Sequence, residues 1–162
     1  MTKESRRKWI LGTIGLIIVG TPVVLLNSLT LDAVQDDIRK TVEGGKPDEG
    51  LAARQIQVVS AYRYTFRSDS AEQAYRQYMK LFYKKDRDGT NAAGKQRAQD
   101  AIYDYANLLD EDDHRPQAYY YYSILLRDWG DAHPQFGKVD TRQHELEKSG
   151  NGGWAPPEGE EQ

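Results

Sequence analysis

The feature that most constrains this chain is an uncharged, largely apolar run from residue 9 to residue 31. Its 23 residues would extend roughly 34 Å as an α-helix, because each helical residue adds about 1.5 Å. The hydrocarbon core of a bilayer is about 30 Å thick, so the run predicts one transmembrane helix. Residues 1–8 carry four basic side chains, which predicts a cytoplasmic N-terminus.

A cleaved signal peptide is the main alternative for this segment. Signal peptides have a shorter apolar core, about 7–15 residues, followed by a cleavage site of the small-x-small type. The best pair near the end of the run is Ser28 and Thr30, which is a poor site. We therefore expect a retained anchor.

Small residues within the run indicate a surface on which another membrane helix could pack closely. Their spacing does not form a regular GxxxG motif. Proline removes one backbone donor and is expected to bend the helix. The predicted transmembrane packing residues are Gly12, Gly15, Gly20 and Pro22.

The remainder of the chain is acidic. After residue 8 there are 18 basic and 24 acidic residues, a formal charge of −6. An acidic surface argues against nucleic acid as a partner, because phosphate binding needs clustered lysine and arginine. The chain has no cysteine, which excludes disulfides, thiolate metal sites and cysteine nucleophiles.

No recognisable catalytic or metal-binding motif is present. The three histidines, His114, His133 and His144, lack ligand spacing, and no GxSxG or phosphate-cradling glycine loop occurs. The acidic run from residue 110 to 113 lacks the glycine and the final glutamate of an EF-hand loop. We predict no catalytic residue, no metal and no cofactor, and no small-molecule substrate is evident.

Apolar residues recur at helical spacing throughout the polar part, and no segment reads as a strand. A first helix carries Leu31, Val34, Ile38 and Val42 and should stop at the glycines 44–45. The second should begin after Pro47, with Phe66 on its inner face. Further helices are predicted over residues 70–84, 92–109, 116–129 and 139–148, with residues 85–91 as a charged loop. The fold class is therefore predicted to be all-α.

Two of these helices resemble each other. Residues 74–82 align with residues 118–126 at an offset of 44, with four identities in nine positions. The pattern of large, small and apolar residues at Tyr119, Tyr122–Ser123 and Leu126 resembles the first helix of a tetratricopeptide repeat (TPR). The residues that resemble its second helix are Ala101, Ile102, Tyr105 and Leu108.

The resemblance to the TPR family covers residues 70–136 and is degenerate. The family repeats about every 34 residues, so about ten residues near 85–94 would be an insertion. The second-helix pattern fails after Gly130. The resemblance implies a small array of antiparallel helices that binds protein.

The expected organisation is a cytoplasmic N-terminus (1–8), the transmembrane helix (9–31), amphipathic connecting helices (32–69), the TPR-like array (70–148) and a disordered tail (149–162). So short an array needs its ends covered, because helical repeats bury their faces against neighbours. Residues 31–66, the membrane surface or another subunit could provide that cover.

Eleven tyrosines lie between residues 62 and 122, four of them consecutive at 119–122. Tyr119 and Tyr122 should face inward, while Tyr120 and Tyr121 should lie at the border or outside. Tyrosine is enriched in protein interfaces, although core packing is the alternative. The predicted interface residues are Tyr75, Tyr78, Tyr119, Tyr120, Tyr121, Tyr122 and Trp129.

Together these features favour a non-enzymatic accessory subunit of a membrane complex, in the class that includes respiratory and photosynthetic assemblies. Its partners would be integral membrane and extracytoplasmic subunits together with the lipid bilayer. A membrane-anchored assembly factor that binds peptides transiently is the second hypothesis, and a cell-envelope enzyme the third. The expected location is the inner (cytoplasmic) membrane with a periplasmic domain, or alternatively the mitochondrial inner membrane.

Overall fold

The computed structural model describes residues 30–45 and 48–153, and in these ranges the chain is helical without any strand. The prediction of an all-α fold is confirmed for this part. A helix over residues 30–44 comes first. The later elements are α2 (Glu49–Tyr64), α3 (Ser68–Tyr78), the π-helix η1 (Met79–Tyr83), α4 (Lys84–Asp88), α5 (Ala92–Glu111), α6 (Arg115–Trp129), the 3₁₀-helix η2 (Gly130–Ala132) and α7 (Phe136–Lys148).

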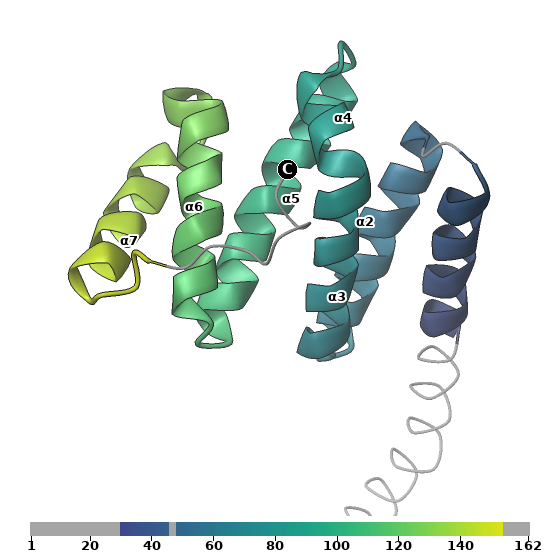
Figure 1. Cartoon of the computed structure of the whole chain (residues 1–162), viewed down its shortest axis with the longest axis horizontal. Helices are drawn as coiled ribbons and strands as arrows, with labels where there is room; N and C mark the ends of the chain where they lie inside the picture. The colour runs from purple at the N-terminus through teal and green to yellow at the C-terminus, as the bar shows by residue number, and fades with distance from the viewer. Residues whose placement is uncertain (1–29, 46–47, 154–162) are drawn as a thin grey trace, which may run out of the picture.

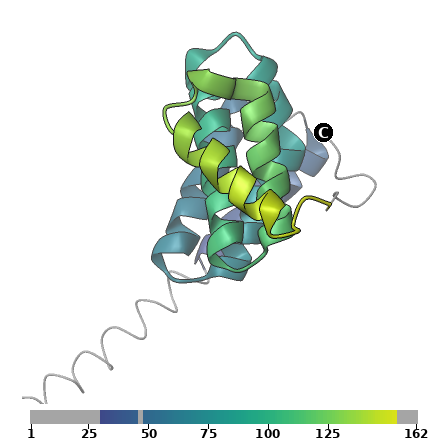
Figure 2. The ribbon, with the colours of Figure 1, turned by 90° about the vertical axis from the view of Figure 1, so that its left-hand side faces the viewer.

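Successive helices run antiparallel and form two layers (Figure 1). The 30–44 helix, α3 and α6 form one layer, and α2 and α5 lie behind it. Helix α7 crosses α6 obliquely and covers the far end of the array (Figure 2). Each helix is thus packed against its neighbours in sequence, as expected for an array of helical hairpins.

One core runs through the whole array. The positions predicted to face inward on α5 are buried, with Ala98 and Ile102 fully so. The first helix contributes Ile38, which is also fully buried. The core cluster takes residues from the 30–44 helix and from α2 together with those of α3, η1, α5, α6 and α7. The predicted division between residues 32–69 and 70–148 therefore does not coincide with a break in the core.

The 30–44 helix and α2 cover the end of the array for which the sequence analysis expected a cover. The Tyr62 hydroxyl of α2 donates to Asp32 at 2.8 Å, and the Gln55 amide donates to Gln35 at 3.3 Å. The Gln35 amide in turn donates to Gln77 of α3. These bonds and the burial of Ile38 hold the 30–44 helix against both layers. Of the three candidates for covering this end (the preceding residues of the chain, the membrane surface or another subunit), the structure shows the first.

The prediction of a charged loop over residues 85–91 is wrong. The helix continues through η1 and α4 to Asp88, and only residues 89–91 connect it to α5. The reason is a buried polar cluster. Asp86 accepts a hydrogen bond from the Tyr78 hydroxyl at 2.8 Å and binds Arg97 of α5 at 2.8 and 2.9 Å. These partners, 8 and 11 residues away from Asp86, hold α4 against α5, although its sequence is polar.

Two further expectations need correction. Phe66 does not lie on the inner face of α2, because α2 ends at Tyr64 and the Phe66 side chain is 94% exposed. The last helix begins at Phe136, three residues before the predicted start. It packs on α6 and buries Val139 and Leu146, so the array continues past Gly130 despite the failing repeat pattern.

Within residues 30–45 and 48–153, no helix is long and apolar enough to cross a membrane. The predicted span (9–31) lies, apart from its last two residues, outside the described residues. Three further predicted features lie outside the described residues. They are the cytoplasmic segment (1–8), the packing residues Gly12, Gly15, Gly20 and Pro22, and residues 154–162 of the tail.

Candidate functional site

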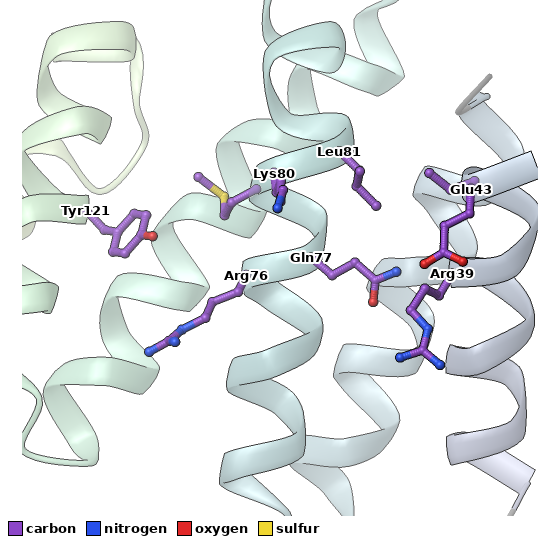
Figure 3. Close-up of a pocket in the computed structure, with 9 residues that line it drawn as sticks. Arg39, Glu43, Arg76, Gln77, Lys80, Leu81 and Tyr121 are labelled. Carbon is purple, nitrogen blue, oxygen red and sulfur yellow. The ribbon is translucent and has the colours of Figure 1, made fainter. Parts of the chain in front are cut away.

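A groove half open to solvent lies on the layer formed by the 30–44 helix, α3 with η1, and α6 (Figure 3). Its volume is about 390 Å³, within the range of binding pockets in proteins. We call it the front groove. Its lining residues are Arg39, Val42, Glu43, Arg76, Gln77, Met79, Lys80, Leu81 and Tyr121.

The apolar part of the front groove comes from three separate elements. Val42 lies on the 30–44 helix, Met79 and Leu81 on η1, and Tyr121 on α6. Val42 and Leu81 are only partly buried, so they present apolar surface to whatever enters the groove. A π-helical turn is rare and is found frequently at functional sites, and here it carries two of these side chains.

Basic side chains outnumber acidic ones in the lining. Arg39, Arg76 and Lys80 face a single carboxylate, Glu43. Arg39 pairs with Asp36 at 2.9 Å, whereas Lys80 has no ion-pair partner among residues 30–45 and 48–153. Long basic side chains can cover apolar surface with their stems while the charged ends remain in water. The groove therefore suits a ligand that is apolar with acidic groups.

Arg76 is fixed in a charged state. Burial opposes its charge, but a hydrogen bond to the Tyr105 hydroxyl at 3.3 Å and the negative charge of Glu72 raise its pKa above the ordinary value. Glu72 lies one turn earlier on α3 and forms an ion pair with Arg76. A guanidinium held in this way presents its charge to the groove without a large loss of side-chain freedom on binding.

Gln77 supplies an unused hydrogen-bond donor. Its side chain extends from α3 toward the 30–44 helix (Figure 3). The amide oxygen accepts from Gln35, but the amide nitrogen is buried and has no partner in the described part of the chain. A buried donor without a partner costs about 1–3 kcal/mol.

The predicted interface residues differ in how deeply the structure buries them. Tyr75, Tyr78 and Tyr122 lie in the core and expose almost no surface, and their role as contact residues stays a prediction. Tyr119, Tyr120 and Trp129 are partly buried against the core. Tyr121, expected at the border or outside, is buried but lines the front groove.

The buried tyrosines form a chain of rings between three helices. Tyr75 of α3 stacks on Tyr105 of α5, with ring centroids 5.2 Å apart. Tyr105 contacts Tyr121 of α6 at 4.5 Å, and Tyr121 meets Tyr120 edge-on at 5.3 Å. Such aromatic pairs add to the stability that burial alone provides. These tyrosines therefore hold the array together, which is the core-packing alternative.

Their hydroxyl groups bond to polar side chains at the edge of the core. Tyr122 donates to Asn107 at 2.7 Å, and Tyr83 donates to Asp128 at 2.9 Å. Burial raises the pKa of Tyr122 and of Tyr83 well above the ordinary tyrosine value. These hydroxyls are therefore neutral donors at neutral pH.

Buried or partly buried acidic side chains are likewise bonded to residues on other helices. Asp128 accepts from Arg87 at 2.7 Å as well as from Tyr83, and Asp110 binds Arg142 at 2.6 and 2.8 Å. Over residues 30–45 and 48–153, no group of three histidine or acidic side chains could hold a metal ion. The polar clusters thus join helices to each other.

The sequence interpretation missed most of the front groove. Arg76, Gln77 and Lys80 had no assigned role, because a polar helix face normally contacts only water. One signal was available in the run from Met79 to Tyr83, which is apolar on more than one side of the helix. An apolar helix face that is broader than contact with a single core requires indicates a second contact surface.

Comparisons of the chain with protein-family models, with curated proteins and with solved structures found no match.

Proposed function

We propose that this chain is a membrane-anchored, non-enzymatic accessory subunit whose TPR-like helical array docks on a partner subunit at the extracytoplasmic face. The run from residue 9 to residue 31 forms the anchor, and the front groove receives a segment of the partner. The site of action is the inner membrane with a periplasmic array, and the mitochondrial inner membrane is the alternative. A respiratory or photosynthetic complex is the class of assembly that we propose for it.

The front groove is the observation that carries the proposal. It combines partly buried apolar side chains with a rim of three basic groups and one acidic group. An amphipathic segment with apolar and acidic side chains would match both properties.

The geometry of the first helix supports the anchor. Residues 30 and 31, the last two of the uncharged run, belong to the helix that extends to residue 44. That helix is held by bonds to α2 and α3. An anchor that continues into a packed helix would fix the orientation of the array relative to the bilayer, as a docked subunit requires.

The assembly-factor hypothesis remains the second candidate, because the groove is open and small. A groove of about 390 Å³ receives only a few side chains, which suits transient binding of a peptide as well as one contact of a larger interface. Stoichiometry separates the two hypotheses. A permanent subunit remains bound after gentle detergent extraction, whereas an assembly factor dissociates.

The test is co-purification of the full chain from native membranes with a charge reversal in the groove. Lys80→Glu places an acidic group among the lining residues and should reduce the recovered partner by about tenfold, equivalent to roughly 1.4 kcal/mol. Lys95→Glu makes the same substitution at an exposed position of α5 outside the groove and is the matched control.

Both lysines are exposed, so neither variant should disturb folding, and circular dichroism verifies this. Loss of the partner with Lys80→Glu alone supports the proposal. Equal recovery with both variants, or equal loss, shows that the groove is not the docking site. Catalytic turnover by the purified chain would overturn the non-enzymatic part.

A further inference from the structure

Two large aromatic side chains are exposed, one at the end of α2 and one in the turn that follows it. Phe66 is 94% exposed and Tyr64 is 85% exposed, and no other large hydrophobic residue in the described part of the chain is exposed to this degree. An exposed aromatic residue is unremarkable alone. Two of them at one helix end form a small apolar projection that the fold itself does not use.

The backbone at Phe66 is unusual as well. The Phe66 amide donates to the Arg63 carbonyl at 3.1 Å, and the Arg67 amide donates to the Tyr62 carbonyl at 3.0 Å. This pair of bonds defines a Schellman motif, in which the residue after the helix adopts a left-handed conformation. Phe66 has φ of 55°, where glycine is favoured and a bulky side chain is strained.

The chain contains its own comparison for this motif. Helix α7 ends in the same arrangement with Gly150 at the left-handed position, and α5 ends with Asp113 there. Glycine and aspartate both tolerate the left-handed region far better than phenylalanine does. Only the α2 motif places an exposed aromatic ring at this position. Backbone strain and apolar exposure therefore coincide at Phe66.

The turn lies where the chain emerges from its uncharged run. Arg67, next to Phe66, forms an ion pair with Asp32 at 3.0 Å, and Tyr62 donates to the same carboxylate at 2.8 Å. Asp32 follows Leu31, the last residue of the run. The start of the 30–44 helix and the turn between α2 and α3 lie at the same end of the array (Figure 1). The segment that carries the two aromatic side chains therefore lies at the end of the array where an anchor would leave the bilayer.

We infer that Tyr64 and Phe66 insert into the interfacial region of the lipid bilayer beside the anchor and form a second membrane contact. This inference depends on the anchor that is part of the proposed function. Aromatic rings favour the membrane–water interface, where the ring is apolar and a tyrosine hydroxyl can stay hydrated. We call these two side chains the wedge. Together, the anchor and the wedge would fix the tilt of the array and thus the direction in which the front groove faces.

The contact is apolar and not electrostatic. The arginines on either side of the aromatic pair are already engaged, Arg67 with Asp32 and Arg63 with Glu111 at 3.5 Å. The turn after α5 adds exposed acidic residues, which anionic lipids would repel. The wedge should therefore enter bilayers of zwitterionic phosphatidylcholine and stay inserted at high salt.

The absence of cysteine permits a direct test with the full chain, because a single introduced cysteine is labelled at one site. Tyr64→Cys carries an environment-sensitive fluorophore, and the protein is reconstituted into phosphatidylcholine vesicles. Asp113→Cys, at the Schellman position of α5, is the matched control. Lipids with a nitroxide near the headgroup and aqueous iodide are the two quenchers.

The inference predicts severalfold stronger lipid quenching at position 64 than at position 113, with protection from iodide. Adding Phe66→Gly to the Tyr64→Cys protein should return the label to water. If the label at 64 is as accessible to iodide as that at 113, the inference fails. Shielding from both quenchers would indicate protein contact and would also overturn it.

Flotation of the same vesicles separates this inference from the proposed anchor. A chain that floats with the vesicles while its label at position 64 is in water retains the anchor and loses only the wedge. A chain that fails to float has no anchor, and both ideas fail together. Insertion that requires anionic lipid, or that is lost in high salt, contradicts the apolar contact.

Discussion

Phe66→Gly should stabilise the helical array, although it removes a large apolar side chain. The left-handed conformation costs an L-residue roughly 1–2 kcal/mol. Glycine avoids this strain but loses about 0.5–1 kcal/mol through its greater freedom in the unfolded chain. Because the Phe66 side chain is 94% exposed, its removal sacrifices almost no burial. The expected net gain in the free energy of unfolding is about 0.5–1 kcal/mol.

The assay is thermal and urea unfolding of residues 30–153 in aqueous buffer, where no lipid contacts the turn. For a domain of this size, a gain of that magnitude raises Tm by about 2–4 °C. Asp113→Gly is the control, with a smaller expected gain because aspartate tolerates the left-handed region better. Gly150→Ala should have the opposite effect, since Gly150 has φ of 86°.

The result that would refute this reasoning is a Tm for Phe66→Gly at or below that of the wild type. Such a result would mean that Phe66 stabilises the turn, and the argument that its left-handed conformation is strained would be wrong. In vesicles the outcome should differ, because the wild-type ring gains interfacial contact that glycine lacks. A stabilising change that weakens membrane contact separates a functional residue from a structural one.

The remaining predictions concern buried polar groups. Asp86→Ala leaves the guanidinium of Arg97 without its bidentate partner and should cost about 3–5 kcal/mol in urea unfolding; a loss below about 1 kcal/mol would show that the cluster is not structural. Tyr78→Phe removes only one hydroxyl from this cluster and should cost about 1–3 kcal/mol. Burial lowers the pKa of His133 below 6.5, so the folded state disfavours its proton. The resulting contribution to stability is complete above pH 6.5 and is lost as the pH falls below it toward the folded-state pKa. The Nδ1 atom of His133 accepts from the Gln135 amide at 3.0 Å, a bond that His133→Asn can reproduce without titrating, so this variant should flatten stability between pH 6.5 and 5, and an unchanged pH profile would contradict the assignment.

Helical periodicity predicted the packing of α5 correctly, because that helix is buried along one regular stripe. Ala98, Ile102 and Tyr105 repeat at intervals of three and four, and all three are buried. The same rule misplaced Tyr119 and Tyr121. Helix α6 contacts both α5 and α7, so more of its circumference is buried than one stripe covers. Tyr121 is drawn inward by its contact with Tyr105.

The segment after Tyr78 was harder to predict, because its determinants are distant in sequence. A run of lysine, aspartate and arginine has the composition of a loop. It is helical because Asp86 meets Arg97, and because Arg87 meets Asp128, a residue 41 positions away. No local pattern carries this information. The front groove was missed for a related reason, since its lining comes from three helices whose side-by-side position is a property of the fold.

The turn at Phe66 was misread as part of an inner stripe, because the pattern of apolar residues continued past the helix end. The Schellman motif that stops α2 normally shows as a glycine, and here phenylalanine occupies that position. The sequence signals for a helix end therefore fail at a position where the residue type is determined by something other than the local backbone conformation. Such failures are expected at functional positions.

The central claim is that the front groove binds a segment of a partner in the native membrane. Site-specific photocrosslinking from position 81, compared with exposed position 57 of α2, tests it most directly. The account predicts one discrete adduct from position 81, in the membrane fraction, whose crosslinked peptide combines apolar and acidic residues. Equal adducts from both positions, or none from position 81, would contradict it.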